Sequence, residues 1–175
     1  MKMIRITIIC ILLLGVVSFV NAQETIFSAA RSNNTKFLNE MFTNKKANID
    51  SVDQRGNTAL IIASYNDNIE SVKILLENEA NTNIQDKMGN TALMGVCFKR
   101  LDNIAELLLY YKADLDQRNF NGATALIFAA TFGADNIIKM LLENGANKTI
   151  VDNYNKTALD YAILQENEST IKLLK

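Results

Sequence analysis

Hydrophobic and polar positions repeat along this chain with a period of 33 residues. The clearest marker is the tripeptide Thr-Ala-Leu, whose threonines are Thr58, Thr91, Thr124 and Thr157. An alanine series keeps the same step, and so do the apolar tripeptides at residues 74–76, 107–109 and 140–142. Because these independent markers share one register, the chain is built from an internal repeat, and an internal repeat predicts a stacked array.

Each period predicts two helices. Threonine is a favourable N-cap, and the small residues that follow it allow a neighbouring helix to approach closely. After a polar break, a second segment such as residues 69–76 carries apolar residues at helical spacing. The next segment, for example residues 78–89, is rich in Asn, Asp and Gly, which favour turns and left-handed backbone. The sequence therefore predicts an all-α array of helix–turn–helix repeats.

Glycine is present in only some of the turns that the register makes equivalent. Between the two helices of a repeat, Gly133 has Asp67, Arg100 and Glu166 as its counterparts. A residue with a side chain is less favourable than glycine in left-handed backbone. We therefore expect the turns without glycine to be looser.

A 33-residue unit of this kind resembles the ankyrin repeat. The family opening Thr-Pro-Leu-His-x-Ala is written here as Thr-Ala-Leu-Ile-Ile-Ala at residues 58–63, without the proline and histidine. The resemblance covers nearly all of residues 23–175 and implies a solenoid of about five repeats, the first of them degenerate. Their approximate bounds are residues 24–55, 56–88, 89–121, 122–154 and 155–175. We expect Asp160, Glu166 and Glu168 to give the last repeat the polar outer face of a cap.

Residues 1–22 predict a signal peptide. Lys2 and Arg5 precede an apolar stretch of 15 residues (6–20), and a cleavage site follows Ala22. The alternative is an uncleaved anchor, but 15 helical residues rise only about 22 Å, less than the ~30 Å of a hydrocarbon core. We therefore expect residues 23–175 to be exported to the periplasm or the extracellular space, with no attachment to the membrane after the signal peptide is cleaved. Cys97 would then be the one cysteine, either a small buried helix residue or a reactive or intermolecular thiol.

The composition argues against catalysis and against binding of nucleic acid. The chain has no histidine, which is the commonest general base and metal ligand near neutral pH. The formal net charge is −1, and no basic stripe suited to a phosphate backbone is present. The sequence also lacks a phosphate-binding loop, a nucleophile elbow and a metal-spaced cluster of Cys and His. We predict a protein that is not an enzyme and that uses no cofactor or metal.

The resemblance implies a binding surface on the concave side of the array, where loop tips and the exposed positions of the first helices meet. Large aromatic side chains carry much of the energy of protein interfaces. The hypothesis is that five aromatic side chains and one methionine bind a partner protein: Tyr65, Phe98 and Phe132 on the first helices, and Met88, Phe120 and Tyr154 on the loop tips. The alternative is that Tyr65, Phe98 and Phe132 pack against adjacent helices as core. The resemblance also implies that Asp53, Asp86, Asn119 and Asp152 hydrogen-bond the loop turns.

We therefore predict a non-catalytic protein–protein interaction module that acts outside the cytoplasm through its concave surface. The alternative is a structural or protective accessory protein that stabilises an envelope enzyme or assembles with itself. A repeat fold specifies shape, and the identity of the partner depends on a few surface side chains.

Overall fold

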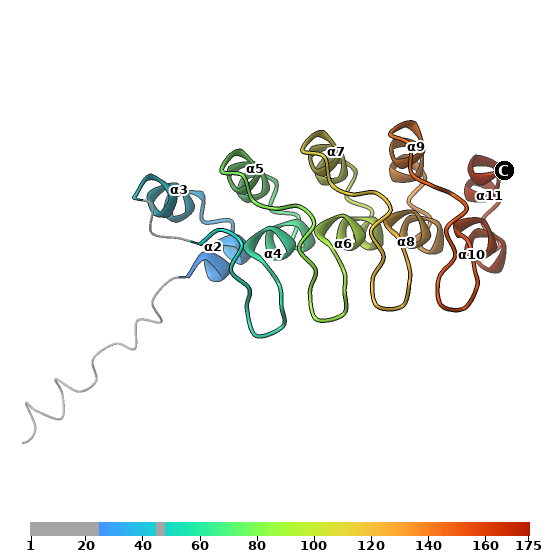
Figure 1. Ribbon diagram of the computed structural model, residues 1–175. Helices are drawn as coiled ribbons and strands as arrows, with labels where there is room; N and C mark the ends of the chain where they lie inside the picture. The colour runs from blue at the N-terminus through green and yellow to red at the C-terminus, as the bar shows by residue number, and fades with distance from the viewer. Residues whose placement is uncertain (1–24, 45–47) are drawn as a thin grey trace, which may run out of the picture.

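The computed structural model describes residues 25–44 and 48–175, so the expected signal peptide lies outside the described residues. Within these ranges the chain forms ten α-helices and no β-strand. The helices pair into five units that stack side by side, with their first helices in one row and their second helices in another (Figure 1). This arrangement confirms the predicted all-α solenoid of helix–turn–helix repeats.

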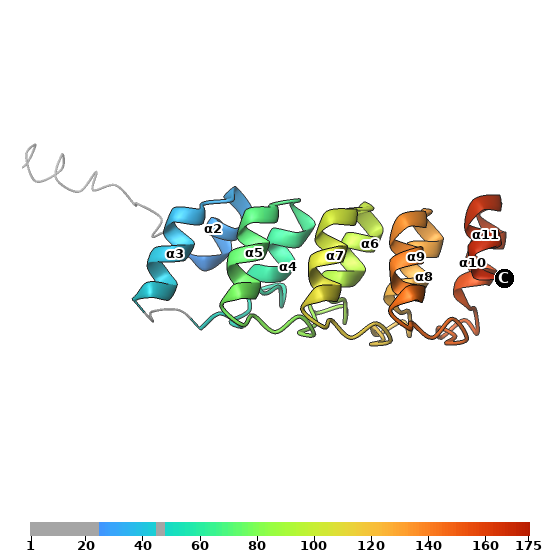
Figure 2. The same ribbon diagram turned by 90° about the horizontal axis from the view of Figure 1, so that it is seen from above.

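The first helices make up the inner row and the second helices the outer row, whose members stand nearly parallel when seen from above (Figure 2). The inner row consists of α2 (Ile26–Ser32), α4 (Ala59–Tyr65), α6 (Ala92–Lys99), α8 (Ala125–Phe132) and α10 (Ala158–Leu164). The outer row consists of α3 (Thr35–Thr43), α5 (Ile69–Glu77), α7 (Asp102–Tyr110), α9 (Asp135–Glu143) and α11 (Glu168–Leu174).

The predicted N-cap threonines begin the inner helices. The Thr58 hydroxyl accepts a hydrogen bond from the Ile61 N–H at 3.2 Å, and Thr91 and Thr124 make equivalent bonds at 3.4 Å. Thr157 caps α10 in the same way, and Asp160 accepts a bond from the Thr157 N–H at 2.8 Å. These bonds satisfy N–H groups that the first turn of a helix leaves without a partner.

The turns between paired helices keep one backbone conformation whether or not glycine is present. Gly133 has a φ of 65°, and its counterparts Asp67, Arg100 and Glu166 have φ values of 59°, 58° and 53°. Left-handed backbone costs a residue with a side chain about 1–2 kcal/mol. The packing of the two helices on either side of the turn outweighs that cost, so the sequence difference does not change the backbone geometry.

The core runs through the whole stack between the two rows. Inner helices contribute small residues such as Ala63 and Ala129, which are completely buried, and outer helices contribute leucines such as Leu75 and Leu108. Cys97 is completely buried among them, which confirms the prediction of a small buried helix residue. Small side chains on the inner row allow successive repeats to pack closely.

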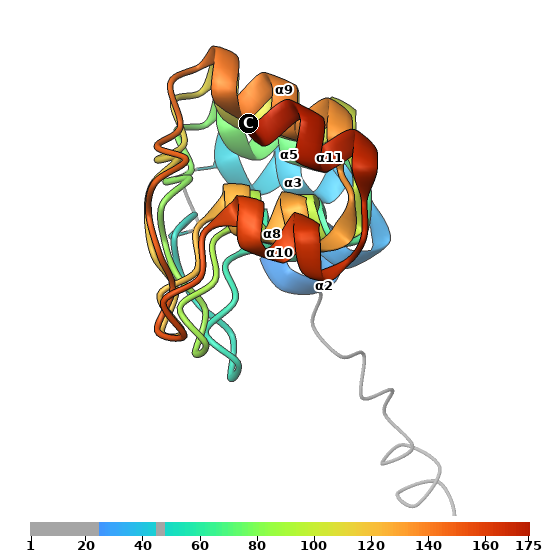
Figure 3. The same cartoon turned by 90° about the vertical axis from the view of Figure 1, so that its right-hand side faces the viewer.

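Four finger loops, defined by residues 53–57, 86–90, 119–123 and 152–156, extend past the inner row on the side away from the outer row (Figure 3). The first side chain of each loop closes it. In the first loop, Asp53 Oδ1 accepts hydrogen bonds from the N–H groups of Arg55 and Asn57 at 2.8 and 2.9 Å. Asp86, Asn119 and Asp152 accept the equivalent pairs at 2.7–3.0 Å. The structure therefore confirms that these four residues hydrogen-bond the loop turns, as the resemblance implied.

Backbone hydrogen bonds also join each finger loop to the next. The Lys87 N–H donates to the Arg55 carbonyl at 3.1 Å, and the Phe120 N–H donates to the Met88 carbonyl at 3.2 Å. The Asn153 N–H continues the series with a bond of 2.9 Å to the Asn121 carbonyl. The four tips therefore form one connected wall along the stack.

The last repeat exposes Glu166 and Glu168 as expected, but it also exposes apolar side chains. Asp160 is occupied in capping α10, whereas Ile163 and Leu164 on the same helix are each more than half exposed. In earlier repeats the position of Ile163 is held by Ser64, Cys97 and Ala130, which the following repeat buries. Within the described residues, α10 therefore carries exposed apolar surface.

Candidate functional site

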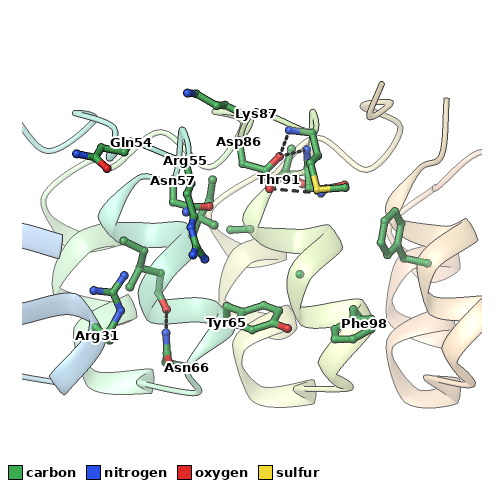
Figure 4. A pocket seen from close by; sticks show the side chains of 17 residues that line it. Arg31, Gln54, Arg55, Asn57, Tyr65, Asn66, Asp86, Lys87, Thr91 and Phe98 are labelled. Carbon is green, nitrogen blue, oxygen red and sulfur yellow. Dashed lines mark hydrogen bonds between the residues drawn. The ribbon is translucent and has the colours of Figure 1, made fainter. Parts of the chain in front are cut away.

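A groove of about 720 Å³ lies between the inner helices and the finger loops, centred on the second and third repeats (Figure 4). Arg55 and Lys87 extend from two successive finger loops on one side of it. Tyr65 and Phe98 lie on the opposite side, at the ends of α4 and α6. The groove therefore has a wall of finger loops and a rim of aromatic rings.

The three predicted aromatic residues of the inner helices form a continuous row across three repeats. The rings of Tyr65 and Phe98 are stacked, with centroids 6.1 Å apart and planes 7° apart. Phe132 meets Phe98 edge to face at a centroid distance of 4.6 Å. Each of the three side chains is at least 40% exposed, so they lie on the surface of the stack and not in its core. We call Tyr65, Phe98 and Phe132 the aromatic row.

The three predicted tip residues are even more exposed, between 64% and 72%. The structure brings Met88 together with Tyr65 and Phe98 in the lining of the groove. Phe120 lies against Gly89 of the preceding loop, where an added Cβ would be 2.7 Å from the Phe120 ring. Phe120, Phe132 and Tyr154 are outside the groove lining and extend the exposed apolar surface along the stack.

Gly95 contributes a hollow that our sequence reasoning missed. It occupies the fourth position of α6, where α4, α8 and α10 have the large residues Ile62, Phe128 and Tyr161 and the degenerate first repeat has Ala29. A Cβ added to Gly95 would lie 3.7 Å from Tyr65 Cδ2, and no other described atom outside the α6 backbone and the two adjacent residues would lie within 4 Å of it. The missing side chain therefore leaves space in the groove, and the signal for it was a glycine among large residues in one column of the repeat.

Carboxylates near the finger loops are held by hydrogen bonds to their own loops. Desolvation acts to raise the pKa of Asp152, but bonds from the Tyr161 hydroxyl and the Lys156 and Tyr154 N–H groups outweigh it and lower the pKa. The same Asp152 bond, helped by burial, raises the pKa of Tyr161 to about 12. Burial raises the pKa of the Cys97 thiol, which keeps it neutral. These groups stabilise the fold and do not assemble an acid–base pair in the groove.

Neither a metal cluster nor a membrane-spanning helix is found in the described residues. Across residues 25–44 and 48–175, no three His, Cys, Asp or Glu side chains gather as a metal site would require. In those same ranges the longest helices have nine residues, and none is long and apolar enough to cross a bilayer.

The helix pairs stack in register, and the linked finger loops and the inner row enclose an open groove. These features define a helical repeat solenoid. The family model described as ankyrin repeats (3 copies) matches residues 26–119 and residues 103–175, which together leave out only the first 25 residues. The chain belongs to the ankyrin-repeat family. Ankyrin repeats are generally protein-interaction modules and are typically non-catalytic. No curated protein matches this sequence.

Proposed function

We propose that the protein is a non-catalytic scaffold that binds a partner protein outside the cytoplasm through its concave surface. The observation that carries the proposal is the aromatic row, in which three rings from three repeats contact one another and still face solvent. Covering apolar surface contributes about 25 cal/mol per Å², and contiguous exposed apolar patches are typical of interaction sites. Met88, Phe120 and Tyr154 on the finger tips extend the proposed contact surface.

Replacement of the aromatic row with serine tests this proposal. The parent protein and a Tyr65→Ser, Phe98→Ser, Phe132→Ser variant are immobilised and exposed to envelope and secreted fractions of the source. Thermal unfolding of both is measured in parallel. Since the three rings are exposed, we expect the variant to keep its melting temperature and to lose the retained partner. A large drop in melting temperature would instead identify the rings as structural.

The matched control removes an exposed aromatic ring elsewhere. Tyr110 on α7 is 75% exposed and contacts Tyr111, outside the groove. We expect Tyr110→Ser to retain the same partner as the parent. Equal loss from Tyr110→Ser and from the aromatic-row variant would contradict a site in the concave surface.

The proposed location outside the cytoplasm rests on residues 1–22. N-terminal sequencing of the protein recovered from the envelope and from the culture medium tests it directly. We expect the mature chain to begin at Gln23, because small residues precede that position. Recovery of a chain that keeps residues 1–22, or recovery from the cytoplasm alone, would contradict export.

Self-assembly in a structural role is the second candidate, and the exposed Ile163 and Leu164 favour it. Contact of these two side chains with a second copy of the chain would remove exposed apolar surface from water. Sedimentation over a range of protein concentrations measures the association. Self-assembly predicts oligomers that disappear in Ile163→Asp, Leu164→Asp and persist in Tyr110→Ser. A monomer at all concentrations would exclude it.

A further inference from the structure

The groove has a basic lining. Arg31, Arg55 and Lys87 line it, against a single carboxylate, that of Asp86. Asp86 Oδ1 already accepts hydrogen bonds from the N–H groups of Met88 and Asn90 at 2.7 and 2.8 Å. Arg31 also interacts electrostatically with the Asp53 carboxylate at the start of the first finger loop. The lining therefore has an excess of positive charge, which Arg55 and Lys87 carry on the finger loops.

A fourth cation extends this basic lining along the rim. Lys99 Nζ lies 5.1 Å from the centre of the Tyr65 ring, which places its charge beside the aromatic row. In the described part of the chain the ion pair that forms is Glu70–Lys73, on the outer helix α5. Arg31, Arg55, Lys87 and Lys99 thus have no carboxylate within ion-pair distance in the described residues.

The outer row of helices has the opposite charge. Its five helices carry eight carboxylates and four lysines. The carboxylates are Glu40, Glu70, Glu77, Asp102, Glu106, Asp135, Glu143 and Glu168, and the lysines are Lys36, Lys73, Lys139 and Lys172. Although the net charge of the whole chain is only −1, negative charge is concentrated on the outer row and positive charge in the groove.

The groove also has space for one large apolar side chain. The hollow above Gly95 is bordered by Tyr65, and Phe98 and Phe128 line the same groove. Aromatic rings pack favourably against other aromatic rings, edge to face or offset-stacked. A hollow lined in this way suits an aromatic side chain better than a charged one.

We propose that the groove binds an extended acidic segment of a partner protein, with one aromatic side chain of that segment in the hollow above Gly95. This proposal rests on the proposed function of the concave surface and specifies the chemistry of the partner. A chain that runs along the stack passes Arg55 and Lys87 on one side and Arg31 and Lys99 on the other, so acidic residues on both sides of the aromatic residue gain favourable contacts. A nucleic acid fits less well, because four cations are few for a polyanion and the outer row repels it.

A selection from displayed random peptides of about twelve residues, long enough to span roughly 40 Å when extended, tests the proposal on the immobilised protein. We expect the enriched peptides to carry one aromatic residue with Asp or Glu on both sides. A representative peptide is then synthesised, and its affinity is measured by fluorescence polarisation at several ionic strengths. A single-stranded oligonucleotide of similar length is the competing probe.

Charge reversal locates the site. Arg55→Glu, Lys87→Glu changes two groove cations, and Lys139→Glu, Lys172→Glu makes the same total charge change on the outer row. Because each reversal replaces an attraction with a repulsion, we expect the groove variant to bind the peptide about tenfold or more weakly. The outer-row variant should stay within about twofold of the parent, and added salt should weaken the parent's binding.

The outcomes separate this inference from the proposed function. Neutral or basic peptides that the aromatic-row serine variant fails to bind would overturn the acidic partner and leave the concave binding surface intact. Peptides that bind equally to that variant, or no enrichment at all, would overturn both. Competition by the oligonucleotide at similar concentration would replace the acidic protein segment with a nucleic acid.

Discussion

Gly95→Ala should make the protein more stable, although it adds a methyl group to the groove. Gly95 is in the interior of α6, where glycine is about 0.8–1.0 kcal/mol less favourable than alanine because of its greater freedom in the unfolded chain. An added Cβ would lie 3.7 Å from Tyr65 Cδ2, an ordinary van der Waals contact. No strain offsets the gain, so the helix propensity decides the sign.

The expected size of the effect follows from these two terms. We expect the free energy of unfolding to rise by about 0.5–1 kcal/mol. For a chain of this length, about 1 kcal/mol raises the melting temperature by roughly 2–4 °C. Urea denaturation followed by far-UV circular dichroism measures the first quantity, and differential scanning calorimetry measures the second.

Gly133→Ala is the matched control, since it makes the same chemical change with the opposite expectation. Gly133 ends α8 with a φ of +65°, and an added Cβ would lie 2.8 Å from Asn167 Nδ2. We expect a loss of about 1–2 kcal/mol or more, from left-handed strain and the close contact. A loss of stability in Gly95→Ala, or no loss in Gly133→Ala, would refute the reasoning. A stabilised Gly95→Ala that binds its peptide less tightly would show that the hollow itself contributes to binding.

Three further predictions concern residues outside the groove. Asp152→Asn should lower the free energy of unfolding at pH 7 and make it depend less on pH in the acid range. The reason is that the lowered pKa of Asp152 contributes stability above about pH 4, and this stability is lost as the pH falls through the pKa of the folded state. Denaturation at several pH values checks this, and the loop itself should still close, since the amide of Asn119 closes the equivalent loop. Cys97 should resist thiol reagents in the folded protein and react after unfolding, which mass spectrometry of labelled samples measures. Ser64→Ala should raise the free energy of unfolding by about 1 kcal/mol or more, which urea denaturation measures. The buried hydroxyl of Ser64 has no hydrogen-bond partner in the described residues, and Ala130 occupies the equivalent position two repeats later.

Much of the fold could be predicted because its determinants are local and repeated. Thr58 and its three counterparts marked the start of the inner helices α4, α6, α8 and α10, and the structure confirms them as N-caps. The turns were harder, since Arg100 and Glu166 take the left-handed conformation of Gly133 only under the constraint of packed helices on both sides. Local preference predicts such a residue poorly when tertiary packing decides its backbone.

The candidate site could be predicted in part. The register placed Tyr65, Phe98 and Phe132 near one another, but the stacked and edge-to-face contacts depend on side-chain geometry that a sequence does not specify. The hollow above Gly95 and the separation of charge were missed for a different reason. Both require the residues to be sorted by helix row and column, and the charges look interspersed when they are followed along the chain.

The hydrogen bonds between finger tips have a mechanical consequence. In the described residues, backbone hydrogen bonds join loops 86–90 and 119–123 to a finger loop on each side. The linked finger loops should therefore move together and not one by one. The hollow above Gly95 lies within the repeat whose own finger loop, 86–90, is held from both sides. Because this part of the wall is held on both sides, we expect binding there to depend on how well the shape of the ligand fits the hollow.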